Sequence, residues 1–112
     1  MASERADVLY GTLALLILKT LDSMGPLHGY ALARRIEQIS RDSITLKQGT
    51  LYPALRKLQH QGWITAKPGE TDSGRQAKFY AITKHGRAQL QAETENWDRA
   101  ASIVARFLKG LS

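Results

Sequence analysis

The 112-residue chain has no cysteine, no long hydrophobic run and few aromatic residues. Without cysteine it forms no disulfide and has no thiolate to act as metal ligand, nucleophile or redox centre. Its longest apolar run, residues 13–18, is far shorter than the roughly 20 residues that cross a bilayer. The N-terminus is polar and of mixed charge, unlike a secretory signal. We therefore expect a cytoplasmic protein with no membrane association.

Motifs for catalysis and for cofactor binding are also missing. The histidines His28, His60 and His85 lie in separate segments, and none is spaced from a second ligand as in a metal site. No serine lies in a nucleophile-elbow context, and no glycine-rich phosphate-binding motif occurs. We expect neither enzymatic activity nor a cofactor.

Positive charge is what the chain has in excess. It carries 16 Lys and Arg against 10 Asp and Glu, which gives a net charge of +6 at pH 7. A chain of this length forms one domain with one modest core. A small basic domain favours nucleic acid or another anionic surface as its partner.

Hydrophobic periodicity and turn residues predict four helices and two short strands. We expect helices over residues 9–23, 28–39, 47–61 and 84–109, strands over residues 63–67 and 78–82, and an exposed loop over residues 68–76. This order is that of a winged helix-turn-helix. The predicted fold class is mostly α with a small two-stranded β-wing. The winged helix-turn-helix would occupy residues 1–82, and one long dimerisation helix would occupy residues 83–112.

The third predicted helix has the pattern of a recognition helix. Leu51, Leu55 and Leu58 fall within about 60° of each other on a helix and form one buried stripe. The opposite face and its flanks carry small, hydroxyl and basic residues, namely Gly49, Thr50, Tyr52, Pro53, Arg56, Lys57 and His60. Such a front can meet phosphates and base edges in a major groove while the back anchors to a core.

The first and last predicted helices indicate a partner chain. The first is apolar nearly all round, and a helix without a polar face must be covered on more than one side. The last has an apolar stripe that recurs every seven residues and suits helix-helix packing. We expect a homodimer, with a monomer that is unstable alone. The predicted interface residues are Leu13, Leu16, Leu90, Trp97, Ala101, Val104 and Leu108.

Five motifs across almost the whole chain carry a family resemblance. They are YGTL at residues 10–13, HGY at 28–30, GTLYPAL at 49–55, GWI at 62–64 and the stretch from Arg75 through FY at 79–80 to TKHG at 83–86. The chain resembles the PadR family of bacterial transcriptional regulators, in the short form with a single C-terminal helix. The resemblance implies a homodimeric winged-helix repressor of a short inverted repeat. In such a dimer the C-terminal helix packs against the partner, largely on its first helix.

Nine residues are predicted to contact double-stranded DNA. Arg56 and Lys57 supply charge, and the hydroxyls of Thr50 and Tyr52 can donate to phosphate oxygens, although Tyr52 could equally cover the edge of the core. The other five are Tyr30, which resembles the family's phosphate-contacting tyrosine, Lys47 and Gln48 near base edges, and Arg75 and Lys78 in the wing. Lys47 and Gln48 depart from the residues that family members usually carry before this glycine. Arg34 and Arg35 are expected to form an ordinary solvated face.

Trp97 allows two interpretations. Two copies facing each other across a two-fold axis could sandwich a flat aromatic effector, as the resemblance to ligand-sensing short members suggests. Alternatively, Trp97 is simply the largest apolar residue of the interface. The function also has an alternative, because a winged helix can serve as a protein-docking module. RNA binding lacks its usual support, since no exposed aromatic platform is evident.

Overall fold

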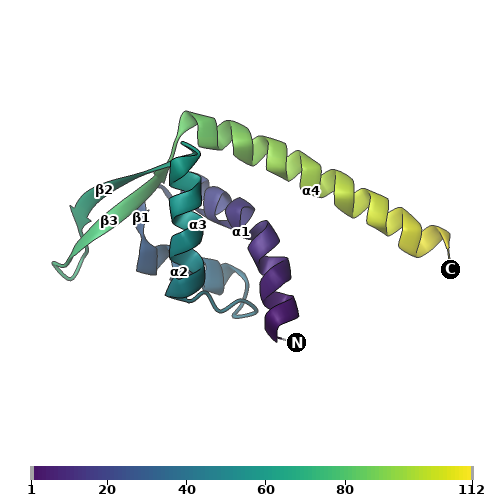
Figure 1. The fold of residues 1–112 in the computed structure, drawn as a ribbon, viewed down its shortest axis with the longest axis horizontal. Coiled ribbons are helices and arrows are strands. Elements are labelled where there is room, and N and C mark those ends of the chain that lie inside the picture. Colours follow the sequence, from purple (N-terminus) through teal and green to yellow (C-terminus); the bar gives the residue numbers. More distant parts are fainter. Residues whose placement is uncertain (1, 112) are drawn as a thin grey trace.

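The computed structural model describes residues 2–111, with side chains from residue 12 onward, and it has the predicted winged-helix order. The elements are α1 (Ala2–Met24), β1 (Leu27–His28), α2 (Gly29–Ile39), α3 (Gln48–His60), β2 (Ile64–Glu70), β3 (Gln76–Ile82) and α4 (Lys84–Gly110). Figure 1 shows α1 to α3 gathered into one body, the β2–β3 wing on its left and α4 leaving toward the right. The predicted fold class is confirmed.

The helix boundaries follow local signals. α1 ends at Met24, where Gly25 has a left-handed φ of 83° and Pro26 follows. α2 is capped by the imidazole of His28, whose Nδ1 accepts from the Ala31 N–H at 3.4 Å. The backbone of α1 begins seven residues earlier than predicted, because the polar N-terminal residues continue the helix.

The sheet has three strands in the order β1-β3-β2, one more than predicted. The two residues of β1 pair with Tyr80 and Phe79. A two-residue strand shows no periodicity, so sequence pattern could not reveal it. The exposed loop expected over residues 68–76 is also wrong at its ends, because β2 runs through Pro68 to Glu70 and β3 begins at Gln76. Proline is tolerated there because β2 is an edge strand that pairs only with β3.

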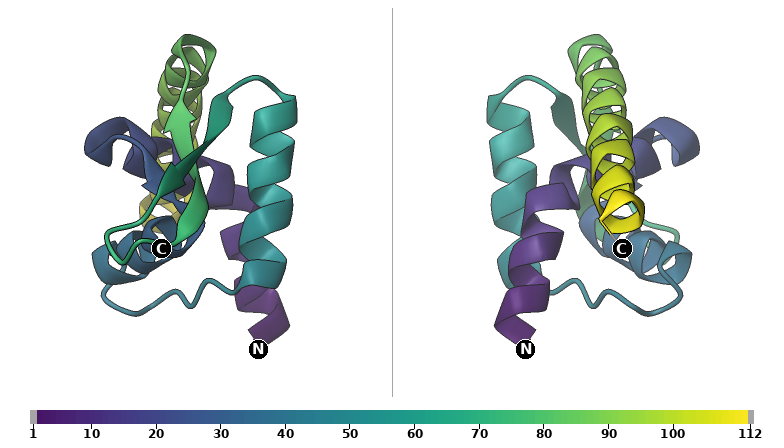
Figure 2. Two further views of the ribbon diagram at one scale, coloured as in Figure 1. Left: turned by 90° about the vertical axis from the view of Figure 1, so that its left-hand side faces the viewer. Right: turned by 90° about the vertical axis from the view of Figure 1, so that its right-hand side faces the viewer.

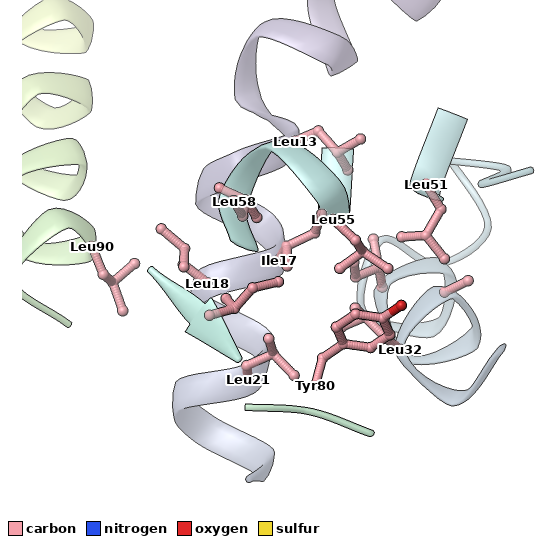
Figure 3. Packing of buried hydrophobic residues seen from close by; sticks show 13 residues of the cluster. Leu13, Ile17, Leu18, Leu21, Leu32, Leu51, Leu55, Leu58, Tyr80 and Leu90 are labelled. Carbon is pink, nitrogen blue, oxygen red and sulfur yellow. The ribbon is translucent and has the colours of Figure 1, made fainter. Parts of the chain in front are cut away.

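One hydrophobic core joins the first three helices to the sheet. Figure 3 shows leucines and isoleucines from α1, α2 and α3 packed with Tyr80 of β3, and Leu90 reaching the same cluster from α4. The predicted stripe of Leu51, Leu55 and Leu58 is buried here. Leu13 and Leu90 are also buried, at 2% and 8% exposure, within a single chain. Neither therefore offers surface to a partner, because the fold of one chain has already covered both side chains.

A tight joint fixes the start of α4 against the turn between α3 and β2. The Thr83 hydroxyl donates to the Gly62 carbonyl at 2.7 Å and accepts from the Gly86 N–H at 2.9 Å, so Thr83 is the N-cap of α4. The Thr83 N–H donates to the Trp63 carbonyl at 3.0 Å. Gly86 lies so close that a Cβ on it would meet this same carbonyl oxygen. The GWI and TKHG motifs thus form one structural unit.

Beyond this joint α4 leaves the rest of the molecule. Near its start Arg87 pairs with Asp22 of α1 at 3.4 Å. From Thr94 to Leu111 every residue is exposed. Figure 1 shows this part of α4 extending away from the other elements along the long axis of the molecule, which measures 57 Å, and Figure 2 shows the same helix nearly end-on. The exposed large apolar side chains on this segment are Trp97, Ile103, Val104, Phe107, Leu108 and Leu111.

Candidate nucleic-acid interface

A groove lies between the wing and the first turns of α2 and α3. Its volume is about 720 Å³. The residues that line it come from β1, α2, α3, β3 and the wing loop, and they are His28, Gly29, Tyr30, Tyr52, Thr71, Asp72, Ser73, Arg75, Gln76, Ala77, Lys78 and Tyr80. We call this space the wing groove. It brings together four residues predicted to contact DNA, from positions up to 48 residues apart in the chain: Tyr30, Tyr52, Arg75 and Lys78.

The phenol groups of the wing groove differ in their environments. Tyr30 is 71% exposed, whereas Tyr52 is half-buried and Tyr80 is in the core. Burial raises the pKa of Tyr80 above 10.0, the nearby Tyr52 phenol raises that pKa further, and the positive charge of Arg56 opposes both. Tyr52 packs against the edge of the core, as one of its two interpretations predicted, and it also lines the groove, where its contact with phosphate stays a prediction.

The tip of the wing is an ordered turn. The Thr71 hydroxyl accepts from the Arg75 N–H at 3.1 Å, and the Thr71 N–H donates to the Arg75 carbonyl at 2.8 Å. Gly74, with a φ of 86°, supplies the left-handed position that closes the turn. The backbone of Arg75 is thus held at both polar groups while its side chain stays exposed.

Further predicted residues lie along α3. Lys47, Gln48 and Thr50 are exposed at its N-terminal end, and Lys47 caps the helix without a side-chain hydrogen bond. The N-terminal end of α3 and the tip of the wing both lie on the lower side of the molecule in Figures 1 and 2. No acidic residue occurs in the first turn of α3 to offset the positive end of its dipole.

The C-terminal half of α3 has a second basic surface. Arg56 and Lys57 line a shallow hollow of about 590 Å³ together with Gln59 and His60. This hollow shares no lining residue with the wing groove. The nine predicted residues therefore lie in three places: the wing groove, this hollow and the exposed N-terminal end of α3. His60 follows Arg56 by four residues, a spacing that already put the two on one helix face.

The basic side chains of the wing groove and of the hollow on α3 are available to an anion. Within the part of the chain whose side chains are described, none of Arg56, Lys57, Arg75 and Lys78 forms an ion pair. By contrast, Arg34 pairs with Glu37 at 3.3 Å and is satisfied on the surface of α2. Residues 1–82 carry eleven Lys and Arg against seven Asp and Glu, so a net charge of +4, out of +6 for the whole chain, belongs to the winged-helix part.

Sequence reasoning missed two residues that shape this face. Gly29 lies under the phenol of Tyr52, and Glu37 accepts from the Leu46 N–H at 2.8 Å, just before α3 begins. Both act across the α2–α3 pair, so neither leaves a periodic signal. The HGY motif was the one sequence signal that included Gly29.

Comparison with known proteins identifies the family. Residues 17–92 match the model of the transcriptional regulator PadR-like family. The chain belongs to this family. DNA binding and transcription regulation are accordingly its general role, in a family of regulators rather than enzymes.

This PadR-like chain is similar both to proteins known by sequence and to solved structures. It is 29% identical to an uncharacterized protein of Lysinibacillus sphaericus over 96% of this chain and 97% of that protein. It is 36% identical to the transcriptional regulator YqjI of Escherichia coli over 88% of this chain, but it spans only 44% of YqjI. A transcriptional regulator from Clostridium thermocellum superposes with a TM-score of 0.82 and 27% identity, over 92% of this chain and 99% of that one. A PadR family regulator from Eggerthella lenta superposes with a TM-score of 0.79 and 28% identity, over 96% and 91%.

The described residues lack two kinds of feature. None of their helices is long and apolar enough to span a membrane. Nor do these residues contain a cluster of three or more metal-ligating side chains.

Proposed function

We propose that this PadR-like chain is a repressor that binds an inverted-repeat operator as a homodimer. Residues 1–82 would bind DNA and residues 83–112 would hold the dimer together. α3 enters the major groove, and the wing contacts the adjacent minor groove or its phosphates. The observation that carries the proposal is the wing groove, where phenol hydroxyls and unpaired cations from separate elements converge. The DNA-contacting residues are Tyr30, Lys47, Gln48, Thr50, Tyr52, Arg56, Lys57, Arg75 and Lys78.

The roles of these residues follow from their chemistry. Hydroxyls and cations in the wing groove suit phosphate oxygens, which set the register of the protein on DNA without reading bases. Gln48, exposed at the N-terminal end of α3, is the residue best suited to read a base, since glutamine can pair bidentately with adenine. The operator sequence therefore depends most on Gln48 and its neighbour Lys47.

The exposed part of α4 supports the dimer. Apolar side chains from Trp97 to Leu111 are exposed on the part of α4 that extends beyond the body of the molecule, with Leu108 exposed at 74%. Large exposed apolar surfaces of this kind mark interaction sites. Leu16, partly exposed on α1, adds to the surface that a partner's α4 would cover. Our interface consists of Leu16, Trp97, Ala101, Val104 and Leu108, and it omits Leu13 and Leu90.

Regulation would act on the spacing of the two recognition helices. Trp97 is 55% exposed in the single chain, so two copies could hold a flat aromatic effector between them in the dimer. An effector bound there would shift α4 and thereby the α3 helices. Unchanged operator affinity with the ligand bound would contradict this part of the proposal.

The test is fluorescence-anisotropy binding to the chain's own upstream promoter DNA and to a scrambled duplex, over a series of salt concentrations. A preference of about 10³ or more for the promoter is expected of a specific regulator. If about six phosphates are neutralised per dimer, the slope of log K against log salt is about −5. Arg56→Ala removes two contacts per dimer and should reduce that slope by about 2.

The matched control is Arg34→Ala, because Arg34 is a surface cation of the same charge that is paired with Glu37. It should leave both preference and slope unchanged. Equal, weak binding of wild-type protein to both duplexes would contradict the proposal. It would instead favour a winged helix that docks another protein, in which case Arg56→Ala would be silent.

A further inference from the structure

Gly29 faces the side chain of Tyr52 at the floor of the wing groove. A Cβ placed on Gly29 would lie 2.5 Å from the Tyr52 hydroxyl oxygen and 3.0 Å from the ring carbon that bears it. The phenol end of Tyr52 therefore occupies the space that any side chain at position 29 would need. Within the described chain, left-handed φ angles among glycines occur at Gly25, Gly62 and Gly74. The backbone at position 29 thus does not itself require glycine, and the reason for glycine there is space.

This contact constrains Tyr52 from one side. Its ring comes from α3, lies against the first turn of α2 and is half-buried against the core. The hydroxyl is close enough to Tyr80 to raise the pKa of that phenol. A tyrosine packed on two sides has little rotamer freedom left, so less entropy is lost when its hydroxyl binds a ligand.

We propose that Gly29 is a positioning residue for DNA binding. Its missing side chain seats the Tyr52 hydroxyl at the floor of the wing groove, where the hydroxyl donates to a backbone phosphate oxygen. The inference rests on the proposed function, since it requires that the groove receives a DNA strand. It adds a residue that contacts no DNA itself and acts only through Tyr52.

The geometry predicts how an alanine at position 29 is accommodated. The atom it meets is the far end of a side chain, so Tyr52 moves while α2 keeps its place. We therefore expect Gly29→Ala to fold normally and to bind operator about 150-fold more weakly. That factor corresponds to two hydrogen bonds per dimer to charged phosphate oxygens, each of about 1.5 kcal/mol. Tyr52→Phe, which lacks the hydroxyl, should lose about the same.

The deciding measurement is a double-mutant cycle of Gly29→Ala and Tyr52→Phe in operator binding. If Gly29 acts through the Tyr52 hydroxyl, the double variant is about 150-fold weaker than wild type, no worse than either single variant. A purely structural effect of Gly29 would be indifferent to that hydroxyl and would give an additive loss of about 2 × 10⁴-fold. The salt slope should stay at the wild-type value in all three variants, because the tyrosine is uncharged.

Each remaining outcome decides the matter. Wild-type affinity of Gly29→Ala, or an additive double variant, would overturn the role of Gly29 while leaving the regulator intact. If wild-type protein shows no preference for the promoter, the proposed function fails and this inference fails with it. If Gly29→Ala lowers the thermal midpoint of unfolding through a clash with the Tyr52 hydroxyl, the midpoint returns to the wild-type value in the double variant, which lacks that hydroxyl. A midpoint that stays low in the double variant would overturn the proposal. Gly49→Ala is the unfolding control, since nothing lies within 4 Å of a Cβ there.

Discussion

The close approach of Gly86 to the α3–β2 turn allows a sharp prediction about stability. A Cβ on Gly86 would meet the carbonyl oxygen of Trp63 and would lie 2.8 Å from Cγ1 of Ile82. The carbonyl cannot move away without a loss of free energy, because it accepts a hydrogen bond from the Thr83 N–H at 3.0 Å. Gly86→Ala therefore has to overpack the joint or break that hydrogen bond.

The magnitude follows from three contributions. Overpacking of a well-packed site costs about 1–3 kcal/mol, and the loss of one backbone hydrogen bond costs about 1 kcal/mol. Alanine recovers about 1 kcal/mol through its better helix propensity. We expect Gly86→Ala to lower the free energy of unfolding by about 1–3 kcal/mol, and to lower Tm by about 4–12 °C for a domain of this size.

The assay is thermal and urea unfolding at one fixed protein concentration, because dimerisation makes Tm depend on concentration. Gly49→Ala is the matched control, since its added methyl group meets open space. It should leave Tm unchanged or raise it slightly. A Gly86→Ala protein with the Tm of Gly49→Ala would refute the reasoning, because the joint would then tolerate the extra carbon.

Three further predictions concern the dimer, the turn before α3 and the alkaline pH range. Leu108→Glu puts a charge in the proposed interface and should yield monomers in sedimentation, whereas Ser102→Glu, on the opposite face of α4 by helical spacing, should not; a dimeric Leu108→Glu would contradict our interface. Glu37→Ala leaves the Leu46 N–H without its acceptor and should cost about 1–2 kcal/mol in urea unfolding, while Glu37→Gln keeps a carbonyl acceptor and should lose less; equal losses would exclude that hydrogen bond as the cause. The pKa of Tyr80 is raised above 10.0 in the folded state, so the unfolded chain releases this proton first and the free energy of unfolding should fall as pH rises past 10.0. Tyr80→Phe should weaken that dependence, and an unchanged pH profile would show that Tyr80 does not contribute.

The helices could be predicted from the sequence because their signals depend on residues within a few positions, and the family could be predicted because its motifs are short continuous stretches. The leucine stripe of α3, the break at Gly25 and Pro26 and the cap at Thr83 each depend on residues within a few positions. The exposed apolar stripe of α4 was equally readable, since a period of seven residues shows which side chains share a face.

The dimer interface stays a prediction, and burial within one chain limits the residues that it can include. Helical spacing groups Leu90 with Trp97 and Leu13 with Leu16, yet the structure buries Leu90 and Leu13 in one chain and leaves the other two at least partly exposed. Periodicity shows which residues share one face of a helix. It does not show how much of that face is covered by other elements of the same chain. That distance depends on where α4 leaves the body of the molecule.

The sequence by itself determined the order of the four helices and the two wing strands, the basic character and the residues of α3, because hydrophobic periodicity and charge are properties of neighbouring residues. Only the tertiary structure decided that β1 completes the sheet, that Pro68 lies in a strand and that Tyr52 rests on Gly29. Each of these depends on contact between residues far apart in the chain. Side-chain volume and hydrogen bonding at such contacts become visible only when the elements have packed together.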